Sequence, residues 1–170
     1  MTLPTDYVDG DVLTAADVNA ITTAVNAITP KIAKYAYTTG GTTTTTSTNY
    51  TNSGASLSYT PVNASNNLIV SATVGAGFFG DNINQADKRV WLQIYNSTGA
   101  ANVTEQNLLY STEVATDDPD YLIVPGLTLT KVVAASSTSA RTYVVRIKVD
   151  NAAYTGVVGD ITLSVTEVTP

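Results

Sequence analysis

The sequence predicts a mainly β protein, in which an N-terminal arm and a short α-helix precede an antiparallel β-sandwich of jelly-roll-like topology. Only residues 13–28 carry apolar residues at clear helical spacing. From residue 35 the composition changes to Thr, Ser, Asn and Gly, and the apolar period becomes two. About seven to nine such runs, separated by turn-rich stretches, are typical of a sandwich. We therefore divide the chain into an arm and helix (1–34), a Thr-rich linker or edge strand (35–56) and a β-sandwich domain (57–170).

The helix has a recognisable start signal. Thr14 can cap it, Asp17 three residues later can reach back to the cap, and Leu13 can pack on Val18 across it. These features predict a helix start near Ala15.

One narrow apolar stripe follows the cap, made of Val18, Ile21, Val25 and Ile28. A free helix of this length is marginal in water, so either the rest of the chain or other copies of it must cover the stripe. Valine and isoleucine at every seam position favour trimeric over dimeric parallel coiled coils, and no Asn lies on the stripe. We expect three copies of the stripe to form the seam of a homotrimer.

The segments on either side of this helix are predicted less sharply. Residues 1–12 indicate an extended acidic arm, in which Leu3, Tyr7 and Val8 are the apolar positions able to make contacts. After the helix, Pro30 should stop or kink it, or start a second short turn. Because Ile32 and Tyr35 keep the helical spacing, continuation of the seam past the proline stays open.

Alternation of apolar and polar residues identifies the strands. The clearest runs are residues 57–59, 68–74, 90–95, 108–113, 127–129, 143–149 and 161–166. Several positions on the opposite faces of these runs are apolar, where a simple sandwich would face water: Ile69, Trp91, Tyr95, Val132 and Val144. Either neighbouring subunits cover these faces, or the strands curl into a barrel that buries part of both.

Composition excludes several classes of function. The chain has 170 residues, 13% of them charged, and a net charge of -6, which argues against binding nucleic acid through its phosphates. It has no cysteine and no histidine, so disulfides, thiolate metal sites and His-dependent nucleophiles are impossible. No apolar run is long enough to span a bilayer, and the first residues lack the order of a signal peptide. We expect a soluble, non-enzymatic protein without cofactor, metal or membrane partner.

The acidic residues form no convincing catalytic or metal site. Asp117, Asp118 and Asp120 could ligate calcium, but an Asp-Pro turn explains the same residues, and Asp81 with Asn84 is a weaker cluster still. The candidate carboxylates for glycoside hydrolysis show no pairing signature; they are Glu105, Glu113 and Glu167. We expect Glu167 to face solvent. The loops expected to contact a ligand are 80–87, 97–104 (with Asn102) and 115–120.

Ten tyrosines and one tryptophan, against two phenylalanines, indicate aromatic side chains in partly wet surroundings. Such side chains serve both protein interfaces and carbohydrate stacking. A monomeric carbohydrate-binding module, with the helix packed on its own sandwich, is therefore the alternative to a trimer.

The segment DGDVLTAADVNAI, from Asp9 to Ile21, together with the Thr-rich β region behind it, resembles small virion proteins of tailed bacteriophages. Similar segments occur in tail-fibre, minor tail and head-fibre or decoration proteins. SYTPVNASNNLIV, from Ser58 to Val70, is similar to the opening strands of trimeric β-sandwich domains in the same class. The resemblance implies a homotrimer in the virion, docked by its N-terminal arm on capsid or tail proteins and pointing its sandwich outward. Host-surface glycans are a further candidate partner, and neither catalysis nor a cofactor is implied.

Overall fold

The computed structural model describes residues 14–28, 32–79, 88–111 and 122–169. One helix, α1 (Ala15–Ile28), is followed by nine strands. The strands are β1 (Ile32–Gly40), β2 (Thr43–Thr45), β3 (Thr51–Tyr59), β4 (Asn67–Phe79), β5 (Lys88–Asn96), β6 (Ala101–Ser111), β7 (Leu122–Ala134), β8 (Arg141–Val149) and β9 (Thr155–Val168).

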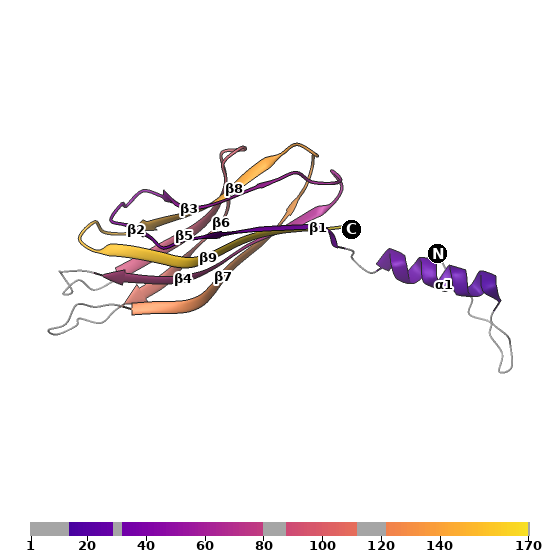
Figure 1. The fold of residues 1–170 in the computed structure, drawn as a ribbon, viewed down its shortest axis with the longest axis horizontal. Coiled ribbons are helices and arrows are strands. Elements are labelled where there is room, and N and C mark those ends of the chain that lie inside the picture. The colour runs from indigo at the N-terminus through magenta and orange to yellow at the C-terminus, as the bar shows by residue number, and fades with distance from the viewer. Residues whose placement is uncertain (1–13, 29–31, 80–87, 112–121, 170) are drawn as a thin grey trace.

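The strands form two antiparallel sheets that face each other, which confirms the predicted sandwich (Figure 1). One sheet has the order β1-β9-β4-β7, with β2 also paired to β9, and the other has the order β3-β8-β5-β6. The pairs are nested along the chain: β1 with β9, β3 with β8, β4 with β7 and β5 with β6. Nested antiparallel pairs divided between two sheets are the topology of an eight-stranded jelly roll, with β2 as an addition. The sheets are separate, so the chain does not form the curled barrel considered above.

Continuation of the helical seam beyond Pro30 is wrong. Ile32 and Tyr35 lie in β1 and pair with Val168 and Thr166 of β9. A full ladder of hydrogen bonds to β9 outweighs the weak helical spacing of two residues.

Residues 35–56 contribute to three strands. Among the described strands, β1 pairs with β9 alone, so it lies at the edge of its sheet. Thr45 in β2 is buried, and the Ser53 hydroxyl in β3 donates to the carbonyl of Val145, 2.8 Å away. The Thr-rich tract is thereby attached to both sheets.

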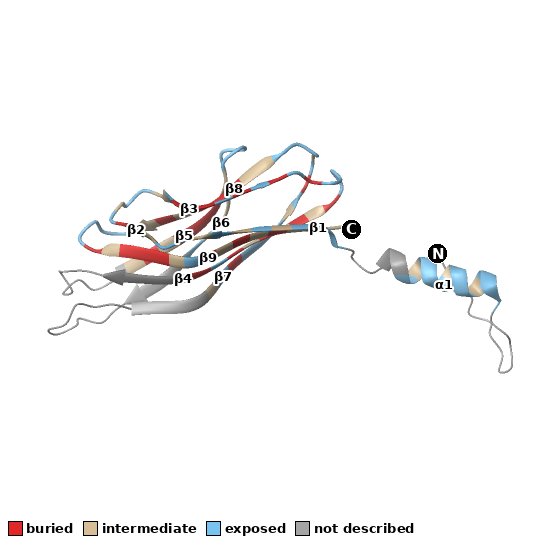
Figure 2. Ribbon diagram, viewed as in Figure 1, coloured by how far each residue is buried: buried red, intermediate tan, exposed pale blue. Residues whose placement is uncertain are grey.

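The core fills the space between the sheets and consists of the inward-facing residues of each strand (Figure 2). Leu68, Val70 and Ala72 of β4 are fully buried, as are Leu92 and Ile94 of β5. Each fully buried Val, Leu or Ile side chain contributes roughly 1.5–3 kcal/mol. The sandwich can therefore bury its own core without help from α1, which lies apart from the two sheets, beyond the end at which β1 begins (Figure 1).

We predict that Gly156→Ala destabilises the sandwich by about 1–3 kcal/mol, because a Cβ added there would lie 2.6 Å from Val149 Cγ1 and 3.3 Å from Val90 Cγ2. Chemical denaturation monitored by circular dichroism measures the change. Gly41→Ala is the matched control, since nothing lies within 4 Å of its added Cβ. Equal stability of the two variants would contradict the packing described here.

Candidate assembly interface

The start of α1 is held by reciprocal hydrogen bonds between two side chains and the backbone. The backbone N–H of Thr14 donates to Asp17 Oδ2 at 2.9 Å, and the N–H of Asp17 donates to Thr14 Oγ1 at 3.3 Å. This is a capping box in which Asp takes the usual place of Glu, so two backbone donors are satisfied. Leu13 lies outside the described residues.

Behind the cap, the apolar stripe of α1 is exposed. Val18, Ile21 and Val25 are 48%, 38% and 51% exposed, and none of them belongs to the core cluster. The side chain of Ile28 and the arm residues Leu3, Tyr7 and Val8 lie outside the described part of the structure. Exposed β-branched side chains along one helix face are costly to leave in water, so this stripe is a candidate surface for a partner.

A second surface, on the outer face of the β3-β8-β5-β6 sheet, combines aromatic rings with cations. The Lys148 ammonium lies 5.2 Å from the Trp91 ring centroid and 4.9 Å from that of Tyr50. The Arg146 guanidinium lies 4.2 Å from the ring centroid of Tyr95. Since Trp91 pairs with Lys148 in the ladder between β5 and β8, the register of the sheet itself brings these groups together.

Polar contacts connect the same face across β5 and β6. Glu105 accepts hydrogen bonds from the Tyr50 hydroxyl at 3.2 Å and from Gln93 Nε2 at 3.1 Å. Burial, together with the negative charge and hydrogen bond of Glu105, raises the pKa of Tyr50, so its hydroxyl keeps its proton and remains a donor.

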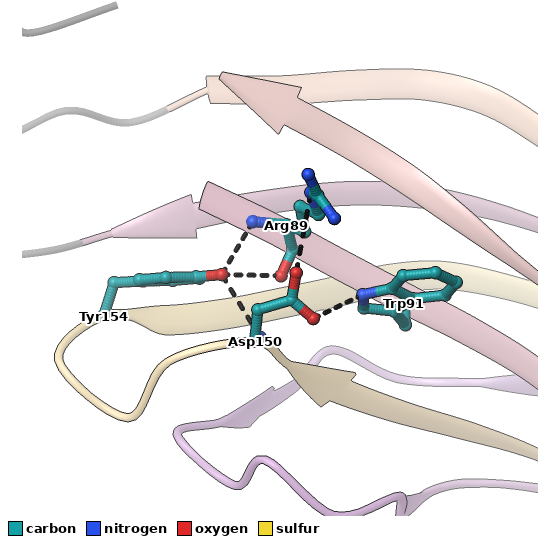
Figure 3. Close-up of polar contacts among 4 residues, drawn as sticks. All are labelled: Arg89, Trp91, Asp150 and Tyr154. Atoms are coloured by element: carbon teal, nitrogen blue, oxygen red, sulfur yellow. Dashed lines mark hydrogen bonds and ion pairs between the residues drawn. The ribbon is translucent and has the colours of Figure 1, made fainter. Parts of the chain in front are cut away.

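At the far end of the same sheet, the turn between β8 and β9 is attached to β5 (Figure 3). The buried Tyr154 hydroxyl donates to the carbonyl of Arg89 at 2.8 Å and accepts from the N–H groups of Arg89 and Asp150 at 2.6 and 3.3 Å. Asp150 in turn accepts from Trp91 Nε1 at 2.6 Å and lies 3.6 Å from Arg89 Nε. Trp91 is therefore held at both its ring and its N–H.

This arrangement limits what the aromatic face can bind. A sugar stacks on an open ring face, whereas Trp91 and Tyr95 each have a cation of their own chain over the ring. The rings act within the sheet, where they support the charged side chains around them.

Glu167 does not face solvent, and that prediction is wrong. The residue is fully buried, and its carboxylate accepts hydrogen bonds from the Tyr59 hydroxyl (2.8 Å), the N–H groups of Val62 (2.9 Å) and Asn63 (3.1 Å), and Asn66 Nδ2 (2.7 Å). Burial opposes ionisation, but these donors outweigh it and lower the pKa of Glu167. The alternation that faces Ile161, Leu163 and Val165 inward also places residue 167 inward. The prediction gave more weight to the charge of the side chain, which is typical of exposed residues, than to this alternation.

The Tyr59 ring near this carboxylate is covered by Lys34, whose Nζ lies 4.7 Å from the ring centroid and donates to the carbonyl of Thr60 at 3.0 Å. Burial and the hydrogen bond to Glu167 raise the pKa of Tyr59. Together these contacts fasten the loop between β3 and β4 to the last strand, at the end of the sandwich nearest α1.

The described strand ends that flank the candidate ligand loops do not all lie at one end of the sandwich. The strand ends flanking residues 80–87 and 112–121 lie beside the β8–β9 turn, as the pairs Phe79 with Thr155 and Lys88 with Ser111 show. The β5–β6 turn lies at the opposite end, since Asn96 pairs with Tyr143 at the start of β8. Asn102, beside that turn, is exposed. The other candidate ligand and carboxylate residues lie outside the described part of the chain: Asp81, Asn84, Glu113, Asp117, Asp118 and Asp120.

Within the described ranges, no group of three or more acidic side chains is placed to hold a metal ion. The same part of the chain contains no helix with the length and apolarity needed to cross a membrane.

Neither family models nor curated protein sequences match this chain. Among solved structures, one of infectious bursal disease virus, Gt strain, is similar at 13% identity with a TM-score of 0.34, over 81% of this chain and 32% of that one. The VP2 subviral particle of the same virus is similar at 11% identity with a TM-score of 0.30, over 83% and 40% of the two chains. This chain therefore spans between about a third and two fifths of those proteins. Its own residues have to indicate its function.

We predict that lowering the pH removes stability that Glu167 supplies. Its folded-state pKa lies below the ordinary value of 4.5, so the unfolded chain binds more protons in that range and stability rises with pH. The contribution is complete above pH 4.5 and is lost as pH falls through the lowered folded-state pKa. Denaturation curves between pH 7 and pH 2 measure it.

Glu167→Gln should cost about 1–3 kcal/mol at pH 7 and flatten this part of the acid dependence. Asp160→Asn removes one negative charge from an exposed residue and should keep the wild-type slope. A Gln variant with the wild-type acid slope would show that another group is responsible.

Proposed function

We propose that this protein is a non-enzymatic, homotrimeric virion component: a fibre, decoration or minor tail protein in which α1 assembles three chains and the jelly roll forms an outward head. The observation that carries the proposal is the exposed stripe of Val18, Ile21 and Val25 on a helix that lies apart from a sandwich with a complete core of its own.

The composition of the stripe supports three copies. Side chains at coiled-coil seam positions pack into holes on the facing helices, and β-branched residues at every seam position disfavour the two-stranded arrangement. Binding to a different protein would not require β-branched residues at every position of the stripe. The capping box between Thr14 and Asp17 fixes where the seam begins.

The N-terminal arm is proposed as the contact with capsid or tail proteins. This role rests on the resemblance of Asp9 to Ile21 to virion proteins of tailed bacteriophages and on the position of the arm ahead of the seam. With α1 at one end of the sandwich, the β8–β9 turn and its neighbouring strand ends lie at the other end (Figure 1). That end would point away from the particle, and any host-surface contact, glycans included, would be made there.

The carbohydrate-binding monomer is not proposed. It requires α1 to pack on its own sandwich, whereas the stripe of α1 is exposed. On the outer face of the β3-β8-β5-β6 sheet, the rings of Trp91 and Tyr95 already carry cations of their own chain.

We predict that the full chain sediments as a trimer in dilute solution and that Ile21→Asp combined with Val25→Asp converts it to a monomer. Two carboxylates per chain, buried in the seam without partners, are incompatible with association. Analytical ultracentrifugation measures the mass, and far-ultraviolet circular dichroism should report unchanged β content.

The matched control is Ala16→Asp combined with Thr23→Asp, which adds the same charge on the opposite side of the helix. It should remain trimeric. A monomeric wild-type chain would overturn the proposal, and a trimeric Ile21/Val25 variant would show that another surface forms the seam.

A further inference from the structure

Where β1, β9, β4 and β7 all pair, the outer face of their sheet carries four rows, each with one residue from each strand. Directly paired residues in antiparallel strands point to the same side, so the register defines the rows. In the order β1, β9, β4, β7 they are Ile32, Val168, Asn67, Ala134; Tyr35, Thr166, Ile69, Val132; Tyr37, Ser164, Ser71, Thr130; and Thr39, Thr162, Thr73, Thr128. We call these residues the uncharged face.

None of them carries a charge, although the protein has a net charge of -6. The charged residues of the same strands lie elsewhere. Lys34 and Glu167 pair with each other on the inward side, and Lys131 pairs with the buried Val70. Asp160 lies where the pairing of β9 with β4 shifts register. The outer face of the opposite sheet, in contrast, carries Arg146, Lys148 and Glu105.

The uncharged face holds four of the five large apolar side chains that the described part of the sandwich exposes; the fifth, Val62, lies in the loop between β3 and β4. Ile32, Tyr35, Tyr37 and Val132 are 68%, 55%, 62% and 56% exposed, and the two tyrosine rings stack with centroids 5.9 Å apart. The first two rows hold most of the apolar residues and lie at the end nearest α1 (Figure 1). The exposed stripe of α1 is thus followed along the chain by β1, which contributes Ile32 and Tyr35 to these two rows.

The hydroxyl groups of the other two rows are partly satisfied within the face. Ser71 and Thr130 share a hydrogen bond of 2.8 Å, and Thr73 and Thr128 share one of 3.0 Å. Such hydroxyls can leave water at lower cost than unpaired ones, because each already has a partner. These two pairs lower the cost of burying the part of the face that lies between β4 and β7.

From these features we propose that, in the trimer proposed above, the uncharged face packs against the same face of the other two copies. Around a threefold axis, one part of the face on each copy packs against a different part of the face on the next copy, so each copy contacts both neighbours. A second copy of this chain fits better than a charged partner, since it brings an equally uncharged face and leaves the charged side chains of the opposite sheet in water. The axis of the α1 seam then continues through the sandwich domains.

Single cysteines test this inference, because the natural chain has none. Thr73→Cys places a thiol on the uncharged face, and Ser58→Cys places one at an exposed position of β3 in the opposite sheet. A short bis-maleimide is added to each full-length variant at dilute concentration. We expect covalent dimers from the Thr73 variant at a yield at least tenfold above that of the Ser58 variant, together with slower labelling of the Thr73 thiol by a single maleimide.

The outcomes separate this inference from the proposed function, because sedimentation of the same samples reports the mass independently. Trimers without crosslinking of Thr73→Cys, or with equal crosslinking of both variants, overturn the face assignment and leave the helical seam intact. Monomers overturn both. Protection of the Thr73 thiol only after addition of purified particles would assign the face to another virion protein and overturn the inference.

Discussion

The pairing of β9 with both β1 and β4 is the interaction on which the rest of the structure depends. β9 bridges the first strand of the sandwich and the centre of its sheet, and it also pairs with β2 near its own start. Its inward residues Ile161, Leu163 and Val165 are buried in the core. Because β1 follows α1 after three residues, this pairing also decides at which end of the sandwich the helix emerges. The position of α1 relative to the sandwich is therefore a consequence of strand order.

Two buried polar anchors stabilise opposite ends of β9. Glu167, near its end, holds the loop between β3 and β4 by hydrogen bonds to two backbone N–H groups and two side chains. Tyr154, just before its start, holds the turn from β8 against β5. In both cases one side chain satisfies several backbone or side-chain groups that a loop would otherwise have to expose. A strand anchored in this way keeps its register, and a fixed register is what aligns the rows of both outer faces.

The two outer faces of the sandwich differ in charge. On the β3-β8-β5-β6 sheet, Arg146 and Lys148 cover aromatic rings and keep the surface charged and hydrated. On the other sheet, the four rows hold hydroxyl and apolar side chains and one amide, that of Asn67, and no charged side chain. Only the second arrangement can be buried without leaving charges unpaired. This asymmetry, together with the exposed stripe of α1, supports an assembly role over a solitary binding module.

The sequence alone determined the fold class, the start of the helix and its stripe, and the approximate position of the strands, because each of these follows from local spacing: about 3.6 residues in the helix, two in the strands. Tertiary structure decided what spacing cannot encode. Ile32 and Tyr35 fit a helix locally but joined β1, since β9 offers a full ladder of hydrogen bonds. Glu167 is charged yet buried, because the donors that satisfy it come from residues about a hundred positions earlier. The uncharged face likewise exists only once strands distant in sequence are placed side by side in register.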